Sequence, residues 1–143
     1  MSGSALMIYY IRDFRKGKRI AGLCKRLGIR LRELKPADES SRIGVLAGVP
    51  QPGGGRMQGE EREALPEELE LPELLIFSGF PDGLLDTFLK EYRAAGIEPV
   101  GLKAVVTLHN MDWTVRELAM ELMKERMAMQ AGTPLSRRGE GNE

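Results

Sequence analysis

The sequence predicts an α/β fold: a single compact domain of two βαβ halves, with about four mostly parallel strands and covering helices. Three observations support this prediction. Apolar runs at residues 6–11 and 74–78 are short and continuous, which is typical of strands buried on both faces. Each run precedes apolar residues at helical spacing, and each helix is followed by a glycine and a second apolar stretch. With 143 residues and 42% hydrophobic content, the chain is long enough to bury one core.

The amino-terminal half covers residues 1–49 and contains the first βαβ unit. Its first strand is the run LMIYYI, and Asp13 is placed to cap the next helix. Gly28 ends that helix, and residues 29–34 alternate apolar and charged side chains as a half-exposed strand does. A short helix is expected over residues 42–47. The apolar face of the first helix has residues at i, i+3, i+4 and i+7: Ile20, Leu23, Cys24 and Leu27.

Residues 50–72 are predicted to be a flexible linker between the halves. The segment QPGGGRMQG supplies glycines, and the acidic run EEREALPEELELP has few apolar residues to anchor it. We do not expect the glycines to cradle a phosphate, because no strand leads into them and no Gly-Lys-Ser/Thr closes the motif.

The carboxy-terminal half covers residues 73–129 and contains a βαβα unit. Its first strand is residues 74–78, and its first helix begins near Pro81 and ends at Gly96. The next strand is predicted over residues 102–108. The apolar face of the helix is formed by Leu85, Phe88, Leu89 and Tyr92.

The last helix has the best-marked start in the chain. Thr114 and Glu117 form a capping box, and Trp113 and Leu118 occupy the hydrophobic staple positions around it. Residues 130–143 are predicted to be a disordered tail.

Two segments suggest an internal repeat. Residues 27–35, LGIRLRELK, are similar to residues 95–103, AGIEPVGLK. A diverged duplication explains this similarity, and so does the general tendency of glycine to end helices and of apolar residues to begin strands. Both explanations stay open.

Three motifs in the carboxy-terminal half carry a family resemblance. They are Phe77-Ser78-Gly79-Phe80, Lys103-Ala104-Val105-Val106-Thr107, and the segment from Asn110 to Thr114. On these residues the sequence resembles a family of small bacterial proteins catalogued as domain of unknown function 3783, over about residues 73–127. The amino-terminal βαβ segment looks like the half that commonly precedes it. The resemblance implies the fold and a loose link to amino-acid metabolism, and it carries over no catalytic residue.

The charges are balanced in total but divided along the chain. The formal net charge is zero, yet residues 1–35 hold ten basic and two acidic residues, and the remainder holds 11 basic and 19 acidic ones. A basic group surrounds the start of the first helix, where cations are unfavourable unless an anion is near. An anionic ligand or pairing with the acidic linker would satisfy it, and we favour pairing. This group is Arg12, Arg15, Lys16, Lys18 and Arg19.

Polar residues are expected to meet where the strands end. If all the strands are parallel, the loops after Ile11, Phe77 and Val106 emerge at one edge of the sheet, the usual ligand crevice of an open α/β sheet. A small anionic metabolite or a protein partner is the predicted ligand. The edge would also gather Asp13, Asp82, His109 and Asp112. The predicted ligand-binding residues are Arg12, Arg15, Lys16, Ser78, Gly79, Thr107, Asn110 and Trp113.

Candidates for catalysis are weak. His109 is the single histidine and has Asp112 or Ser78 as possible catalytic partners, but a loop histidine bonded to backbone is the simpler interpretation. The GxSxG elbow of serine hydrolases is absent. Cys24 lies on an apolar helix face, where a thiol acts as a small hydrophobic residue. We expect no metal site and no cofactor, because one histidine and one cysteine give no ligand spacing.

Composition also bears on partners and compartment. A stripe of Met120, Met123 and Met127 widens the apolar face of the last helix, which suits a protein partner or a homodimer, although core packing is the simpler interpretation. Nucleic acid is not expected as a partner, because no aromatic residues alternate with the basic ones. No apolar run is long enough to span a bilayer, so we expect no membrane contact. With one cysteine, the protein is predicted to be cytoplasmic.

These features leave three hypotheses for function. A non-catalytic binding or regulatory module is favoured. A small enzyme that uses His109 with Asp112 or Ser78 is the second. An RNA-binding accessory protein that uses the basic amino-terminal face is the third.

Overall fold

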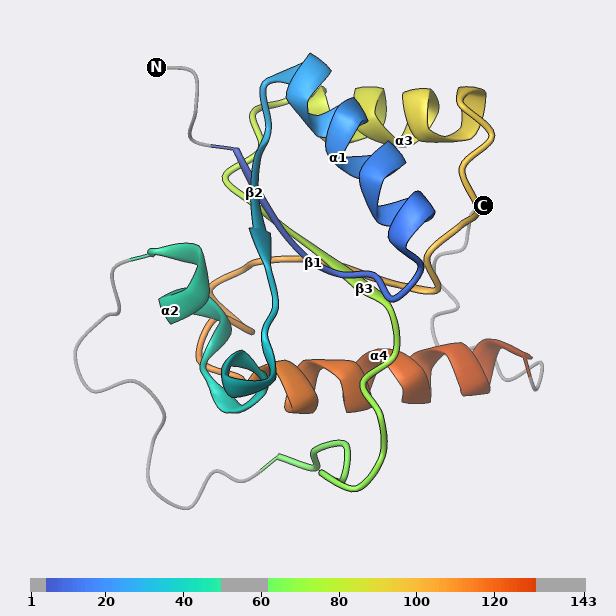
Figure 1. Ribbon diagram of the computed structural model, residues 1–143. Helices are drawn as coiled ribbons and strands as arrows, with labels where there is room; N and C mark the ends of the chain where they lie inside the picture. Colours follow the sequence, from blue (N-terminus) through green and yellow to red (C-terminus); the bar gives the residue numbers. More distant parts are fainter. Residues whose placement is uncertain (1–4, 50–61, 131–143) are drawn as a thin grey trace.

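Four strands form the central sheet, in the order β2-β1-β3-β4 (Figure 1). The computed structural model describes residues 5–49 and 62–130. The strands are β1 (Leu6–Tyr10), β2 (Arg30–Glu33), β3 (Leu74–Ser78) and β4 (Leu102–Val105). The helices are α1 (Phe14–Leu27), α2 (Ile43–Ala47), α3 (Leu84–Ala94) and α4 (Val115–Gln130), with a 3-10 helix, η1 (Pro36–Ser40). The prediction of a single α/β domain with a four-stranded sheet and covering helices is confirmed.

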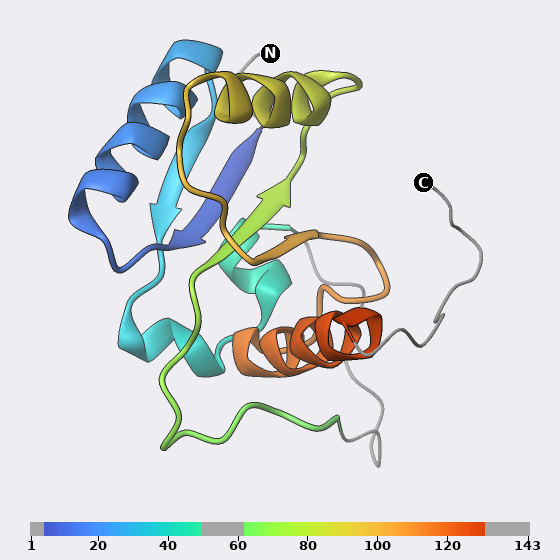
Figure 2. The ribbon, with the colours of Figure 1, turned by 90° about the vertical axis from the view of Figure 1, so that its right-hand side faces the viewer.

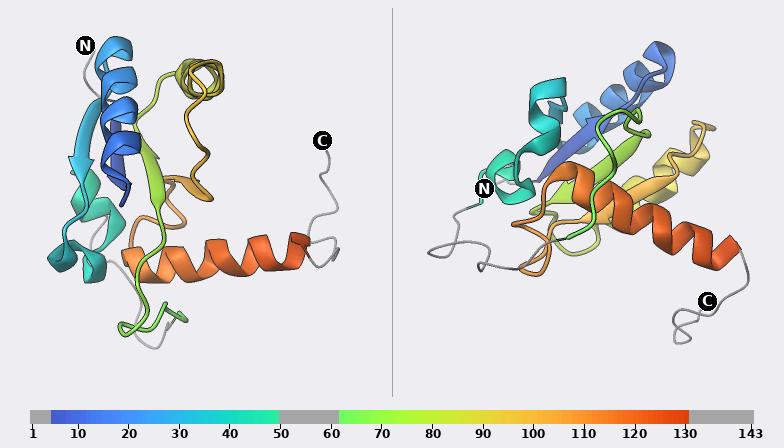
Figure 3. Two further views of the ribbon diagram at one scale, coloured as in Figure 1. Left: turned by 45° about the vertical axis from the view of Figure 1, so that its right-hand side comes forward. Right: turned by 90° about the horizontal axis from the view of Figure 1, so that it is seen from below.

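Helices cover both faces of the sheet, so the domain has three layers (Figures 2 and 3). Strand β3 shows how the sequence produces them. Its side chains alternate in direction, so Leu75 and Phe77 pack with α1 and α3, whereas Leu74 and Ile76 pack with α2 and α4. All five residues of β3 are buried. β3 is therefore buried on both faces. In β1, for which the sequence predicts such burial, the first three residues are buried and Tyr9 and Tyr10 are half-buried.

The direction of the strands differs between the halves. β1 is parallel to β2 and β3 is parallel to β4, as right-handed crossovers through α1 and α3 require. β1 and β3 are antiparallel and are centred on the pair Ile8 and Ile76. The expectation that the loops after β1, β3 and β4 share one edge is therefore wrong. The crossover rule applies within each half, where a helix joins two parallel strands, and it does not fix the direction of β3 relative to β1.

The two halves have the same spacing of elements. The first residues of β1 and β3 each lie 22 positions before a glycine with positive φ, Gly28 or Gly96. β2 and β4 each end ten positions before the start of α2 or α4. The order strand, helix, strand, turn, helix is thus repeated with almost equal lengths, more extensively than the short sequence match indicates.

Reciprocal contacts between the halves follow an approximate two-fold axis. Ile43 N donates to Trp113 O at 2.9 Å, and Val115 N donates to Ser41 O at 3.3 Å. Each residue of the second bond is 72 positions from its counterpart in the first, so exchanging the halves turns one bond into the other. The chain is therefore folded as two similar halves that face each other.

One difference in length breaks the repeat. In the register of the sheet, Leu6 pairs with Arg30, which is 24 positions later, and Leu74 pairs with Leu102, which is 28 positions later. The segment from strand to glycine has the same length in both halves, so the four extra positions lie between Gly96 and β4. We call residues 98–101 the insertion.

The caps of the helices are mostly those predicted. The Asp13 side chain accepts a hydrogen bond from Lys16 N at 3.1 Å at the start of α1. Thr114 N donates to Glu117 Oε1 at 2.9 Å, and Glu117 N donates to Thr114 Oγ1 at 3.2 Å, so the capping box is confirmed. Helix α3 begins at Leu84 instead of near Pro81.

Part of the stretch predicted to be a linker packs on the domain. Leu65 and Leu71 are buried in the core on the α2 and α4 side of the sheet. The Arg116 guanidinium of α4 donates to Pro66 O at 2.6 Å and Leu69 O at 2.9 Å. These contacts fix residues 62–72, whereas 50–61 of the predicted linker and 131–143 of the predicted tail lie outside the described residues. Across 5–49 and 62–130, no helix is both long and apolar enough to span a membrane.

Candidate ligand-binding site

The structure divides the predicted strand-end site between the two opposite ends of the strands, that is, between the two sides of the sheet at which strands begin and end. Arg12, Arg15 and Lys16 follow β1 at the edge where β3 begins. The other predicted ligand-binding residues lie at or beyond the ends of β3 and β4, at the opposite edge: Ser78, Gly79, Thr107, Asn110 and Trp113. The antiparallel pairing of β1 with β3 causes this separation.

Asn110 holds the turn after β4. Its Oδ1 accepts from Thr107 N at 2.9 Å, and its Nδ2 donates to Val105 O at 3.0 Å. The amino-terminal half makes the first of these bonds at the equivalent positions, where Lys35 N donates to Asp38 Oδ2 at 2.9 Å. Because the same bond closes the turn in both halves, it accounts for Asn110 without a ligand.

Trp113 is engaged by two neighbouring side chains. The His109 ring meets the indole edge to face, with 5.3 Å between the ring centroids. The Arg62 guanidinium lies 3.9 Å from the centroid of the indole, within the range of a cation–π contact. Trp113 is buried in the core. These contacts give His109 and Trp113 a role in packing the segment 62–66 against the turn.

The remaining candidates for chemistry are spread through the fold. Ser78 is buried at the end of β3, and Gly79 has a φ of 70°. Asp112 is half-buried in the turn before α4. Cys24 is fully buried, and burial raises the pKa of its thiol to about 12. Among residues 5–49 and 62–130, no three His, Cys, Asp or Glu side chains gather into a possible metal site.

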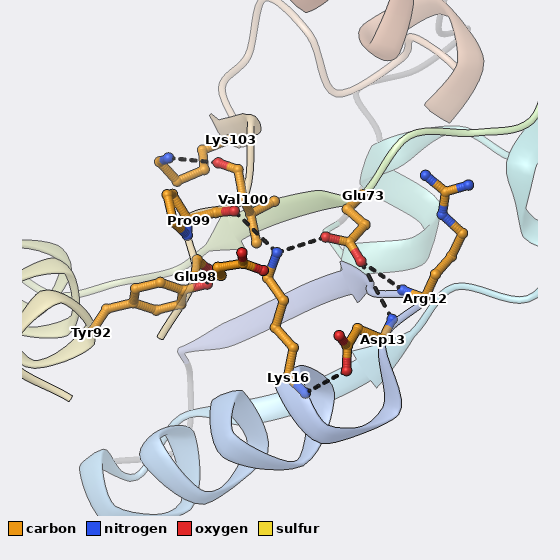
Figure 4. Close-up of polar contacts among 9 residues, drawn as sticks. All are labelled: Arg12, Asp13, Lys16, Glu73, Tyr92, Glu98, Pro99, Val100 and Lys103. Atoms are coloured by element: carbon orange, nitrogen blue, oxygen red, sulfur yellow. Dashed lines mark hydrogen bonds and ion pairs between the residues drawn. The ribbon is translucent and has the colours of Figure 1, made fainter. Parts of the chain in front are cut away.

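The basic group at the start of α1 receives its anion from the protein itself. The Glu73 carboxylate accepts hydrogen bonds from Arg12 N at 3.0 Å, Asp13 N at 3.4 Å and Lys16 Nζ at 2.7 Å (Figure 4). Partial burial alone would raise the pKa of Glu73, but these three donors outweigh it and lower the pKa. Glu70 also pairs with Arg12 at 3.0 Å. Pairing of the acidic stretch with the basic face, which we favoured, is therefore present at these residues.

Four side chains fix the insertion. Each of its successive carbonyls accepts one hydrogen bond, and three of the four donors are cationic. Tyr92 Oη donates to Glu98 O at 2.5 Å, and Lys16 Nζ donates to Pro99 O at 3.0 Å (Figure 4). Lys103 Nζ donates to Val100 O at 2.9 Å and Arg126 Nη1 to Gly101 O at 3.2 Å. The donors come from α3, α1, β4 and α4, so the insertion is held by four separate elements.

The insertion forms one wall of an apolar groove at the edge of the sheet. The groove has a volume of about 500 Å³ and lies between α3, the insertion and β4. Two of its lining residues are cationic, Lys103 and Arg93, and none of those within 5–49 and 62–130 is acidic. Its other lining residues are Leu75, Phe88, Leu89, Tyr92, Ile97, Pro99 and Val100.

Lys103 is the polar centre of this groove. Its pKa is lowered by partial burial and then by the nearby Arg126 guanidinium, so the surroundings supply too little negative charge for the ammonium. Burial also raises the pKa of Tyr92 to about 12, with smaller contributions from Glu73 and Glu98. The phenol therefore stays neutral and acts as the donor to the insertion.

The equivalent place in the amino-terminal half has neither a lysine nor an insertion. Counting along the strands, the position of Lys103 corresponds to Leu31, which packs against the core. The chain passes from Gly28 through Ile29 directly into β2, with no insertion. The insertion and Lys103 thus distinguish the carboxy-terminal half from the amino-terminal one.

The predicted site did not include the groove. Tyr92 was predicted to lie on an apolar helix face, and Arg93 and Lys103 were not singled out for binding. One signal was present, because Lys103 is a cation within an otherwise apolar run. Of the predicted methionine stripe, Met120 and Met123 pack partly against the core and Met127 is exposed, and its role as a partner surface stays a prediction.

Comparison with known proteins concerns this half of the chain. No curated protein and no solved structure matches the chain. The part that does match a family contains β3, α3, the insertion, β4 and α4, and hence the whole groove. The predicted resemblance is confirmed: residues 73–129 match the sequence model of the family described as Domain of unknown function (DUF3783).

Proposed function

We propose that the protein is a non-catalytic binding module that accepts an apolar molecule with an anionic group in the groove between α3 and β4. The observation that carries this proposal is the composition of the groove, whose described lining residues are apolar apart from Tyr92 and the two cations and include no carboxylate. Ligand sites are typically concave and apolar, with a few polar groups that orient the ligand. This arrangement favours an anionic ligand over a neutral or cationic one.

The geometry assigns a role to each part of the groove. Leu89 and Pro99 offer an apolar surface for the body of the ligand, above the buried Phe88 and Ile97. Lys103 Nζ donates one hydrogen bond to Val100 O, which leaves two N–H groups for a carboxylate. Arg93 lines the same groove and adds a second positive charge.

The expected affinity is modest. Burial of about 150 Å² of apolar ligand surface contributes about 4 kcal/mol. A charge-assisted hydrogen bond adds about 2 kcal/mol, and part of the sum is lost to the cost of association. The sum of about 6 kcal/mol corresponds to a dissociation constant of about 40 μM before that cost, so we expect a weaker constant, in the millimolar range, for a small acid.

The other two hypotheses are supported less well. Of the basic face, Arg12, Lys16 and Arg19 already bond to Glu70, Glu73 and the Ala95 carbonyl, which reduces the charge available to RNA. The polar side chains of the turn after β4 bond to its own backbone, which weakens the case for an enzyme.

Calorimetric titration with 4-phenylbutyrate tests the proposal, with 4-phenylbutanol as the neutral analogue. We expect the acid to bind, the alcohol to bind at least about tenfold more weakly, and Lys103→Met to lose about tenfold in affinity for the acid. Lys90→Met is the matched control, because Lys90 is exposed on α3 and does not line the groove. Equal affinity of the acid for the wild type and Lys103→Met would overturn the proposal.

A further inference from the structure

Strand β4 is an edge strand whose outer side is open among the described residues. β3 is its single neighbour in the sheet. Val106 N donates to Phe77 O at 2.8 Å. Because backbone groups alternate in direction along a strand, the N–H and C=O groups of Leu102 and Ala104 also face β3. Those of Lys103 and Val105 therefore face outward. Val105 O is taken by the Asn110 side chain, which leaves Lys103 N–H, Lys103 C=O and Val105 N–H for another strand.

The other edge of the sheet is protected in the usual way. β2 exposes Arg30, Arg32 and Glu33, and charged side chains on an edge strand discourage pairing with another chain. β4 carries one charged residue, Lys103, and its apolar side chains continue onto the surface. Val105 is 46% exposed, and Leu108 beyond it is 85% exposed. The two halves repeat the same fold, but of the two edge strands in the described part of the chain it is β4 that combines open backbone groups with exposed apolar residues.

Lys103 joins this edge to the groove. Its backbone supplies two of the three outward groups, and its side chain lines the groove beside α3. A chain that paired with β4 would direct alternate side chains toward α3 and therefore into the groove. An extended peptide that ends in a free carboxylate has all the chemistry required: backbone groups for β4, an apolar last side chain for the groove and an anion for Lys103 and Arg93.

We propose that the ligand is the carboxy-terminal end of an extended peptide from a protein partner, which pairs with β4 as an added strand and sets its terminal carboxylate against Lys103. This inference rests on the proposed function and specifies its ligand. Lys103 lies at the start of β4, so the peptide runs antiparallel to β4, with its earlier residues toward Val105 and Leu108. A second copy of the chain is a poorer occupant, because the antiparallel register that uses both outward backbone groups of Lys103 sets two Lys103 side chains directly opposite each other.

The test measures binding of short fluorescein-labelled peptides by fluorescence polarisation. The first peptide alternates threonine and valine and ends in leucine with a free carboxylate. The second ends in a carboxamide, and the third keeps the carboxylate but is N-methylated at the backbone positions that would face β4. N-acetylleucine, titrated by calorimetry, serves as the small acid without a strand. We expect the first peptide to bind at least about tenfold more tightly than each of the others, because the second lacks the anion, the third lacks the backbone donors and N-acetylleucine lacks the strand.

Two variants of Val105 distinguish backbone pairing of the peptide with β4 from packing against the Val105 side chain. Val105→Pro removes the outward N–H while the ladder with β3 is kept, since proline is tolerated on an edge strand where its nitrogen faces outward. Val105→Ala is the matched control, because it shortens the same side chain and keeps the N–H. We expect the proline variant to lose about tenfold in affinity for the first peptide and none for N-acetylleucine, and the alanine variant to lose less than about threefold. Melting curves of both variants check that they fold.

Each outcome decides between the two proposals. If N-acetylleucine binds and the first peptide binds no more tightly, the groove takes small acids and the peptide inference is wrong. If neither binds, the proposed function is wrong as well. Equal binding of the carboxylate and carboxamide peptides would overturn the role of Lys103. A dimer in light scattering that the peptide cannot dissociate would show that a second copy of the chain occupies the β4 edge, and would overturn the peptide inference. If Val105→Pro does not fold, the N-methylated peptide still tests the pairing.

Discussion

Replacing Glu73 by Gln tests how the basic face and the insertion are held. The substitution keeps the shape of the side chain and removes the charge that Lys16 and the backbone of Arg12 and Asp13 share. The Lys16 and Glu73 side chains are 10% and 20% exposed, so solvent replaces little of what is lost. Lys16 Nζ keeps its bond to Pro99 O but lacks an anion.

The size of the effect follows from these contacts. Hydrogen bonds to a charged group contribute about 1.5–3 kcal/mol, and the amide of glutamine still accepts weaker bonds, so we expect a loss of about 2 kcal/mol at neutral pH. For a domain of this length, that lowers the melting temperature by about 6–10 °C. The control is Glu70→Gln, whose ion pair with Arg12 has side chains 50% and 64% exposed, and it should change stability by less than about 0.5 kcal/mol.

Acid pH should remove the difference between the wild type and Glu73→Gln. The pKa of Glu73 is lowered in the folded protein from an ordinary value of 4.5, so its stabilisation is present above that value and is lost as the pH falls through the folded pKa. Urea unfolding of both proteins from pH 7 down to about pH 2 covers this range. A double-mutant cycle with Lys16→Met should give a coupling of about 1–2 kcal/mol. If Glu73→Gln costs no more than Glu70→Gln, or if the cost does not change with pH, the Glu73 carboxylate does not hold this network.

Three further substitutions or reagents test the local structure. Gly28 and Gly96 have φ values of 76° and 71°, so alanine at either position should reduce the free energy of unfolding by about 1–2 kcal/mol, and no loss would contradict the left-handed caps. Gly22 lies inside α1 with open space around it, so Gly22→Ala should instead stabilise by about 0.5–1 kcal/mol in urea unfolding, and a loss would show that this position is not an ordinary helical one. Cys24 is buried with its pKa raised to about 12, so a thiol reagent should react rapidly only in urea, and fast reaction of the native protein would show that the α1 face opens.

The sequence predicted the elements well because their signals are local. Asp13 and Gly28 bound α1 as predicted, since an N-cap acceptor and a left-handed glycine act within one turn of the helix. Glu117 completes the capping box with Thr114 for the same reason. The buried run of β3 was recognisable because strands covered on both faces need continuous apolar residues.

The site could not be assembled from such signals. The direction of β3 relative to β1 depends on how two halves pack, and no residue near β3 encodes it. Glu73 therefore reaches the start of α1 although it lies 57 positions beyond Lys16. Leu65 and Leu71 were missed as anchors because they are isolated in an acidic run that resembles a linker.

The insertion was missed for a different reason. The similarity of residues 27–35 to 95–103 aligned the two segments without a gap, which placed Lys103 opposite Lys35. The register of the sheet instead makes Lys103 equivalent to Leu31 of the amino-terminal half. The difference of four positions between the two alignments is the insertion. A groove made by extra residues between a helix and a strand becomes visible only when the paired strands give the register.

Mapping of a bound acid by nuclear magnetic resonance tests the central claim most directly. In a titration of the uniformly ¹⁵N-labelled protein with 4-phenylbutyrate, we predict that the largest amide shifts fall on Tyr92, Val100 and Lys103, and that they are lost in Lys103→Met. Shifts centred on the turn at Asn110 or near Arg15, or no shifts at millimolar acid, would contradict the claim that the groove between α3 and β4 is the binding site.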